Sequence, residues 1–271
     1  MDAVAQPKKN AAALLVGINY IAEPRLRLNG CWNDAISISS LLTSPPYDYE
    51  VDNVQVIIDT KLSDVPSTKK VALLHALAEL SRKSWAEGLD TAVISFSGHG
   101  SQQRDYNGDE EDGLDEGICS SDCMRAGLIL DDELSHILTH FNPKTCVYAV
   151  FDCCHSGTIV DLPFQFPEPS SPTSASTKTA EALKNGPRVV VMSGCRDEQT
   201  SADAYNRTTQ KYGGALTMAL LKALQMPDGH ELGVCQLQAR VVSGLQSEGH
   251  SQFPLVSSSH PITDDIRMFV T

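Results

Sequence analysis

The sequence predicts an α/β protein built around a mostly parallel β-sheet, and two observations carry this prediction. Short apolar runs rich in β-branched residues alternate along the chain with segments of helical periodicity. Several of these runs are apolar on successive residues and not on alternate ones, which is typical of parallel strands covered on both faces. Alternating strands and helices form layered α/β sandwiches. Strands are expected at residues 12–18, 54–58, 91–96, 146–151 and 189–192.

Helices are expected between these strands, at residues 34–42, 67–82 and 131–140. Ser67 is placed to cap the second helix, and the third opens with Asp131-Asp132-Glu133, whose carboxylates suit a helix N-terminus. Later in the chain, helices are expected at about 215–224 and 232–245, with a last short strand near 253–256.

A single domain is expected over residues 1–271, because the last elements complete the same sheet. A larger portion, 1–164, precedes a segment at 165–187 that is rich in Pro, Ser, Thr and Ala and is predicted to be a linker or long surface loop. A smaller portion, 188–271, follows.

The charge of the chain excludes some classes of partner. Its 271 residues include 21 basic and 34 acidic side chains, a formal net charge of −13. Such a surface repels phosphate backbones and anionic lipids, and no basic cluster offsets it, so we expect no nucleic-acid or membrane partner. The chain shows neither an apolar stretch of ~20 residues nor the apolar core of a signal peptide. We therefore expect a cytoplasmic location, in which the eight cysteines stay reduced.

Two predicted strands end in motifs that carry reactive side chains, SGHG at 97–100 and DCCHSG at 152–157. Ligands of open α/β sheets bind beyond the carboxyl ends of the strands. His99 and Cys154 therefore converge if their strands are neighbours, and a single helical crossover between the strands favours this arrangement.

A cysteine and a histidine in contact can perform acyl transfer. An imidazole can hold the thiolate and later protonate the leaving amine. The N–H groups of Gly100 and Cys154 would form an oxyanion hole. The alternative at this point is that Cys153 and Cys154 are buried packing residues and that His99 is a turn histidine.

The two motifs, in this order, resemble the paired His and Cys signatures of the metacaspases, which are caspase-like cysteine peptidases. The resemblance implies a caspase-like three-layer α/β sandwich, with Cys154 as nucleophile and His99 as its acid/base partner. Cys153 occupies a position that is often Ser in the family. Further segments that look like family motifs are 16–20, 28–35, 112–116, 129–134, 161–164 and 199–203.

The same resemblance implies a preference for Arg or Lys before the cut bond. Asp34, Ser97 and Asp152 match the positions that line the family's primary substrate pocket. Two carboxylates in one pocket select a cationic side chain. For Asp34 alone, an N-terminal helix cap is the alternative explanation.

A second acidic feature, at residues 105–116, suggests a hard cation. It is not an EF-hand, because Glu110 stands where that loop needs Gly. The metacaspase resemblance implies calcium dependence instead, and it leaves open whether Asp112 or Asp115 is the ligand. A solvated acidic loop with helix-capping aspartates is the alternative. The positions that match the family's calcium-binding aspartates are Asp115, Asp131, Asp132 and Asp161.

Self-processing is a further expectation, because basic residues lie in segments predicted to be loops. These residues are Lys178, Lys184, Arg207 and Lys211. The resemblance also suggests a monomer. Two alternative functions remain at this point: a catalytically silent caspase-like regulatory scaffold, and a caspase-fold peptidase with another specificity. A papain-like enzyme is disfavoured, because its Cys precedes its His in the chain.

Overall fold

This computed structural model describes residues 10–60, 67–104, 114–154, 159–160, 162–166, 173–174, 183–194, 203–206 and 211–270. Its α-helices are α1 (Cys31–Leu42), α2 (Lys70–Ala86), α3 (Cys123–Ala126), α4 (Asp131–Thr139), α6 (Ala215–Leu224) and α7 (Val234–Ser247). Its main sheet contains β1 (Ala11–Gly17), β2 (Val54–Ile58), β3 (Thr91–Ser97), β7 (Cys146–Asp152), β8 (Phe164–Phe166), β9 (Thr173–Ser174), β10 (Arg188–Ser193) and β13 (Leu255–Ser258). Two small sheets contain β4 (Gly100–Arg104), β5 (Leu114–Ile118) and β6 (Ile129–Leu130), and β11 (Asp203–Asn206) with β12 (Lys211–Gly214). Short 3-10 helices are η1 (Pro24–Leu26), η2 (Val51–Asn53) and η3 (Gly229–Glu231).

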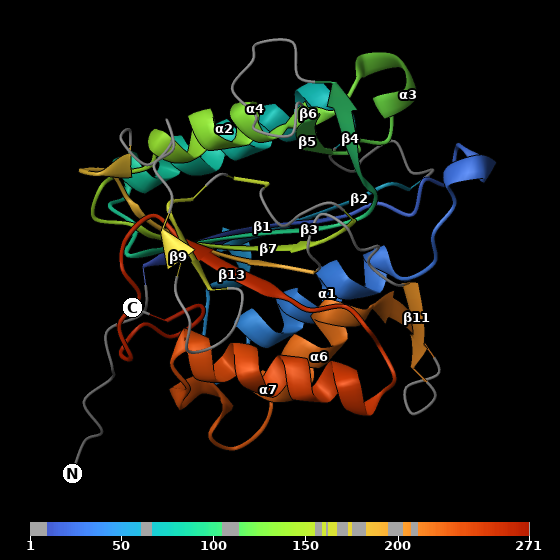
Figure 1. The fold of residues 1–271 in the computed structure, drawn as a ribbon. Helices are drawn as coiled ribbons and strands as arrows, with labels where there is room; N and C mark the ends of the chain where they lie inside the picture. Colours follow the sequence, from blue (N-terminus) through green and yellow to red (C-terminus); the bar gives the residue numbers. More distant parts are fainter. Residues whose placement is uncertain are drawn as a thin grey trace.

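Helices cover both faces of the main sheet (Figure 1). Helices α2 and α4 pack on one face, and α1, α6 and α7 pack on the other. The predicted three-layer α/β sandwich around a mostly parallel sheet is confirmed. In the part of the chain that the structure describes, no helix is both long and apolar enough to cross a bilayer.

Strand β1 shows why the apolar runs are continuous. All seven of its residues are buried. Leu14 and Val16 contribute to the core beneath α2 and α4, whereas Ala13 and Leu15 contribute to the core on the side of α1, α6 and α7. Because successive side chains of a strand point to opposite faces, a strand between two cores must be apolar at every position.

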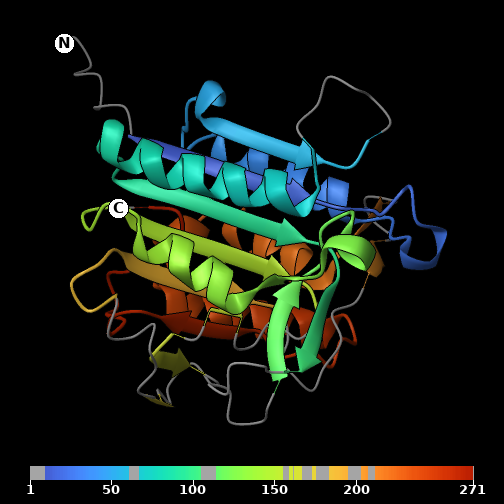
Figure 2. The same cartoon turned by 90° about the horizontal axis from the view of Figure 1, so that it is seen from above.

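The sheet order is β2-β1-β3-β7-β10-β13-β8-β9, and the first five strands run parallel. Figure 2 shows these strands side by side beneath α2 and α4. Strand β13 is antiparallel to β10, and β8 is antiparallel to β13. The carboxyl ends of β1, β2, β3, β7 and β10 therefore meet at one edge of the sheet.

One capping prediction was wrong. Helix α2 begins at Lys70, so Ser67 does not cap it, and the Ser67 hydroxyl accepts a hydrogen bond from Lys69 N–H at 3.3 Å. The N–H of Lys70 donates instead to Asp122 Oδ1, at 2.9 Å. A distant carboxylate thus satisfies the helix end, which local sequence patterns do not reveal.

Several element bounds also differ from the predictions. Helix α1 begins three residues earlier than expected, at Cys31, and β13 ends two residues later, at Ser258. The boundary expected between residues 164 and 165 falls within β8, which pairs with β13. The main sheet thus takes strands from both portions of the chain.

Candidate active site

The register of two neighbouring strands brings the SGHG and DCCHSG motifs together. Strands β3 and β7 pair in parallel, and Ser97 lies opposite Asp152. The link continues past the strand ends, because Gly98 N–H donates to Asp152 O at 3.4 Å. His99 and Cys154 each follow this pair by two residues, so the expected juxtaposition of the two motifs is observed.

Gly100 lies against the cysteine motif so closely that only glycine fits. A Cβ on Gly100 would overlap the carbonyl oxygen of Cys154, and it would lie 3.2 Å from Cys153 Sγ. A non-bonded carbon at such a separation from backbone requires the main chain to shift. The glycine at this position is therefore a packing requirement between the two motifs.

Two groups from the segment after β1 hold His99. Leu26 O lies 2.8 Å from His99 Nε2. The Tyr20 hydroxyl accepts the His99 backbone N–H at 2.8 Å and donates to Cys119 O at 2.7 Å. The Tyr20 and His99 rings also pack together, with centroids 4.8 Å apart.

The contact with Leu26 sets the tautomer of His99. A backbone carbonyl can only accept a hydrogen bond, so Nε2 must carry the proton. Nδ1 then has a lone pair in the neutral ring and can take up a proton. Sequence patterns could not identify Leu26, because its backbone and not its side chain makes the contact.

The thiols around the site differ in environment. Cys154 is half-buried, whereas Cys153 is 0% exposed, which agrees with a packing role for Cys153. Burial, followed by the neighbouring Cys123 thiol, raises the pKa of Cys119 to about 12. All seven cysteines in the described part of the chain are reduced thiols.

Asp34 and Asp152 meet at one place beside these motifs. The Asp34 carboxylate accepts hydrogen bonds from Ser97 Oγ at 2.5 Å and from Gly214 N–H at 2.9 Å. Asp152 Oδ2 accepts the N–H of Thr217, at 2.7 Å, in the first turn of α6. Two elements of the second half of the chain, β12 and α6, thus donate backbone N–H groups to the two carboxylates.

The glycines at the end of β12 make room for this acidic pair. A Cβ on Gly213 would lie 2.9 Å from Asp34 Oδ1, and a Cβ on Gly214 would overlap the Asp152 carboxylate. The two acidic side chains are 3% and 4% exposed. The sequence analysis did not identify either glycine, although a Gly-Gly pair before a helix is a signal of close backbone approach.

The alternative explanation of Asp34 as a helix cap was wrong. Helix α1 starts at Cys31, which places Asp34 inside its first turn, with its N–H bonded to Gly30 O at 3.2 Å. The Asp34 side chain turns to Ser97 on β3 and to Gly214 instead.

Three of the four aspartates matched to a calcium site are described, and they lie on neighbouring segments. Asp115 on β5 is 8% exposed and Asp131 at the start of α4 is 3% exposed. The segments meet because Gly117 pairs with Leu130. Asp132 is exposed beside them.

Asp161 and the stretch 105–113 fall outside the described residues. Within the residues that are described, no cluster of three or more His, Cys, Asp or Glu side chains could hold a metal. Asp115 and Asp131 are buried carboxylates, and carboxylate oxygens are the ligands that Ca²⁺ prefers.

Of the basic residues considered for self-cleavage, only Lys184 has a described side chain. It is exposed and follows Leu183, which is fully buried. Lys211 begins β12, while Lys178 and Arg207 fall outside the described residues.

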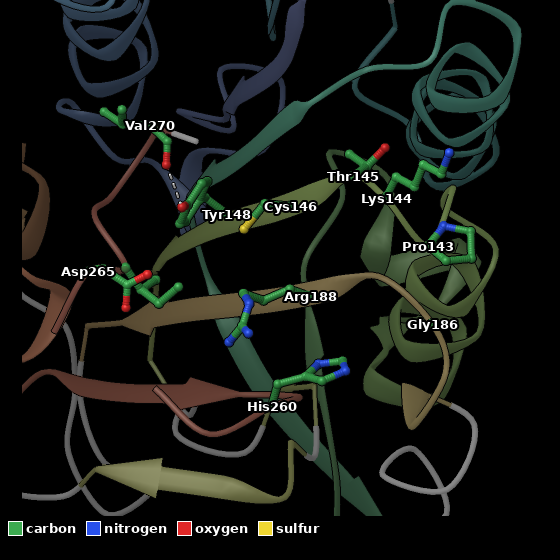
Figure 3. A pocket seen from close by; sticks show the side chains of 11 residues that line it. Pro143, Lys144, Thr145, Cys146, Tyr148, Gly186, Arg188, His260, Asp265 and Val270 are labelled. Carbon is green, nitrogen blue, oxygen red and sulfur yellow. Dashed lines mark hydrogen bonds between the residues drawn. The ribbon is translucent and has the colours of Figure 1, made fainter. Parts of the chain in front are cut away.

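A separate cavity of about 390 Å³ lies at the opposite end of the sheet, beside the first residues of β7 and β10 (Figure 3). Arg188 and His260 extend from neighbouring segments, Asp265 lies across from Arg188, and Lys144 points away from Arg188. Its charges are thus mixed, and the two motifs discussed above contribute nothing to its lining.

Comparisons with known proteins agree with this geometry. Residues 11–163 match the family model described as metacaspase, peptidase C14 domain. Metacaspase-1B of Aspergillus niger is 31% identical over 92% of this chain and 65% of its own length. Metacaspase-1 of Saccharomyces cerevisiae is 30% identical over 95% of this chain and 68% of its own length.

A solved structure is similar in fold alone. The crystal structure of protein GSU0716 from Geobacter sulfurreducens superposes with a TM-score of 0.65 at 22% identity, covering 98% of this chain and 99% of the other. Together the fold and the register define an α/β protein in which a histidine motif and a cysteine motif meet at one edge of the sheet. The chain belongs to the metacaspase family, a family of cysteine peptidases.

We predict that alkylation will distinguish the thiols of the native protein. Because burial raises the pKa of Cys119 to about 12, little of this thiol is ionised at pH 8, and only thiolates react. Iodoacetamide at pH 8 is expected to label Cys154 at least ~10-fold faster than Cys119, as measured by peptide mass spectrometry. Equal rates in folded protein would contradict this description of the site.

Proposed function

We propose that the chain is a cysteine endopeptidase that cuts peptide bonds after Arg or Lys, with Cys154 as nucleophile and His99 as acid/base. One observation carries the proposal: the β3–β7 register that sets Ser97 opposite Asp152 also brings together the two motifs and the acidic pair. The dyad and a cation-selective pocket thus share one edge of the sheet.

The proposed reaction follows from the tautomer of His99. The Cys154 thiol loses its proton to Nδ1, and the sulfur attacks the substrate carbonyl carbon. The tetrahedral intermediate collapses when Nδ1 returns the proton to the leaving amine, which leaves an acyl-thioester on Cys154. Water then attacks the thioester with His99 as base, and the acid product leaves. Leu26 O holds Nε2–H throughout and supports the imidazolium that forms.

Ladder geometry supports Gly100 N–H as an oxyanion-hole donor. Cys119 N–H donates to His99 O at 2.9 Å, so these residues occupy a hydrogen-bonded position of the β4–β5 ladder. Hydrogen-bonded and non-hydrogen-bonded pairs alternate in antiparallel sheets. Gly100, opposite Ile118, therefore directs its N–H away from β5. This direction leaves the group able to face a substrate oxygen.

The acidic pair supports specificity for Arg or Lys. Both carboxylates are buried and flank Gly214, whose N–H contacts one and whose Cα approaches the other. A substrate guanidinium or ammonium entering here would meet two negative charges in a poorly solvated place, where the attraction is stronger than in water. A substrate Asp would be repelled.

We predict that the protein hydrolyses fluorogenic peptides ending in Arg and not those ending in Asp. Cys154→Ala is expected to abolish turnover. Asp34→Asn is expected to lower kcat/KM for the Arg peptide by about 10-fold or more, because it removes one of two charges facing the substrate. Asp52→Asn, an exposed carboxylate on η2, makes the same charge change and should have no effect.

Two results of that assay would contradict the proposal. Cleavage of the Asp peptide would indicate another specificity on the same fold. Absence of cleavage of either peptide, with calcium present, would favour a catalytically silent scaffold.

We also propose that calcium activates the enzyme through Asp115, Asp131, Asp132 and Asp161. The burial of Asp115 and Asp131 on paired segments supports the proposal, because buried carboxylates are stabilised when they ligate a cation. A bound Ca²⁺ would supply positive charge that neutralises these side chains. Strand β5 also pairs with β4, which follows His99 directly, so calcium at the acidic residues would act on the site through this pairing.

Calcium is predicted to raise the melting temperature of the wild-type protein, because a ligand that binds only the folded state stabilises it. Asp131→Asn is expected to reduce this shift by more than half and to raise the calcium concentration needed for activity. Asp264→Asn, a carboxylate in the C-terminal segment, serves as the control. An unchanged melting shift in Asp131→Asn would overturn the assignment of this residue.

Self-processing at Lys178, Lys184, Arg207 or Lys211 is part of the proposal. We predict fragments ending at these residues when wild-type protein is incubated with calcium, and none with Cys154→Ala. Cleavage at Lys184 is expected to be slow, because a buried neighbour, Leu183, must leave the core first. Mass spectrometry of the fragments tests this. The same fragments from a variant with all four residues changed to Gln would contradict it.

We further propose a monomer in the cytoplasm that acts on protein or peptide substrates and binds neither nucleic acid nor membrane. The net charge of −13 supports the last point.

A further inference from the structure

We propose that Asp59 is a positioning residue for His99, acting through a hydrogen-bonded relay along the edge of the sheet. The proposal rests on the proposed function, because it assigns Asp59 a part in the chemistry of His99. Asp59 follows β2 directly, is 7% exposed, and lies two strands away from the strand that precedes His99.

Three N–H groups converge on the Asp59 carboxylate. Oδ1 accepts hydrogen bonds from Asn19 N–H and from Trp32 Nε1–H, each at 2.6 Å, and Oδ2 accepts one from Ile21 N–H at 2.7 Å. Hydrogen bonds to a buried carboxylate are short and roughly twice as strong as neutral ones. Asp59 thus fixes both ends of the segment that connects β1 with α1.

That segment closes on itself through Asn19. The Asn19 side chain accepts Cys31 N–H at 3.0 Å, and its backbone O accepts Leu28 N–H at 3.0 Å. Leu26 N–H donates to Glu23 O at 3.0 Å. The position of the Leu26 carbonyl therefore depends on contacts that begin at Asp59.

The segment delivers both groups that hold His99. Tyr20 lies between two donors to Asp59, Asn19 and Ile21, and its hydroxyl receives the His99 N–H. The Leu26 carbonyl oxygen accepts a hydrogen bond from Nε2 of the His99 ring. Burial raises the pKa of the Tyr20 hydroxyl well above its ordinary value, so this group remains a proton donor to Cys119 O.

The backbone conformation of Tyr20 indicates that the contacts with Asp59 constrain this segment. Tyr20 has φ of 53°, in the left-handed region that side-chain-bearing residues avoid. Such a conformation is unfavourable and persists only where its surroundings impose it. The hydrogen bonds to Asp59 from the residues on either side impose it here.

The sheet order makes the relay direct. Strands β2, β1, β3 and β7 are consecutive neighbours, and their carboxyl ends carry Asp59, Tyr20, His99 and Cys154 in that order. A change at Asp59 therefore reaches His99 through hydrogen bonds that cross from one strand end to the next, without touching substrate.

Asn at position 59 is the informative substitution. It keeps the shape of Asp but replaces one acceptor oxygen with a donor NH₂, which must face an N–H group of the 19–32 segment. The expected result is a displaced Leu26 carbonyl and a His99 ring that loses its fixed orientation. Trp32→Phe is a milder variant, since it removes one donor and leaves the carboxylate and the other two bonds.

The test is the pH dependence of Cys154 alkylation by iodoacetamide, followed by peptide mass spectrometry. It needs neither substrate nor calcium. In the wild type, His99 is expected to stabilise the thiolate, so that His99→Ala slows labelling at pH 7 by about 10-fold. Asp59→Asn is expected to slow the labelling of Cys154 at pH 7 by at least ~3-fold, and Trp32→Phe is expected to slow it by less. In both variants the pKa of the Cys154 thiol should rise toward its value in His99→Ala.

Gln238→Ala is the matched control for lost stability. Gln238 is fully buried and donates to Phe166 O at 2.7 Å and to Pro254 O at 3.0 Å, so its loss destabilises the fold without touching the relay. The pH dependence of Cys154 alkylation in Gln238→Ala is expected to match that of the wild type.

With the Arg peptide, Asp59→Asn is expected to lower kcat and to leave KM within about twofold, as for a loss of catalytic orientation alone.

The outcomes separate the relay from the dyad. If His99→Ala shifts the Cys154 titration and Asp59→Asn does not, the relay is wrong and the dyad stands. If His99→Ala has no effect, the dyad itself is wrong. If Asp59→Asn fails to fold, the Trp32→Phe variant provides the test. The proposal would be overturned if the pH dependence of Cys154 alkylation in Trp32→Phe were the same as in Gln238→Ala.

Discussion

The parallel register of β3 and β7 is the constraint on which the site depends. It sets Ser97 opposite Asp152, His99 and Cys154 each follow that pair by two residues, and the Asp34 carboxylate contacts Ser97. Because a slip of one residue would turn each side chain to the other face, the register also separates residues facing the two cores. The requirements of packing and of the site are therefore met by the same pairing.

The chemistry is divided among strand ends that meet at one edge. Cys154 and His99 lie after two adjacent strands, the group that orients His99 follows the next strand, and its anchor, Asp59, follows the edge strand. The acidic residues proposed to bind the substrate lie on α1 and β7, on the side of the core that α1, α6 and α7 cover. Residues far apart in sequence thus act together because parallel strands share a direction.

The sequence predicted what depends on local pattern. The buried parallel strands and the two motifs follow from residue types whose side chains act directly, whereas the grouping of Asp34, Ser97 and Asp152 was expected from the family resemblance. Contacts made by backbone groups could not be predicted from the sequence, because a backbone carbonyl such as that of Leu26 is present in every residue. Capping by a distant residue, as for Lys70, and short strands such as β8 were missed because long-range pairing decides them.

The structure of the protein covalently trapped by an arginyl chloromethyl ketone would locate the nucleophile, the oxyanion hole and the substrate pocket at once. We expect a bond from Cys154 Sγ to the methylene carbon, an inhibitor oxygen facing Gly100 N–H, and the guanidinium between Asp34 and Asp152. A guanidinium bound elsewhere, or an adduct on another cysteine, would show that the proposed site is wrong.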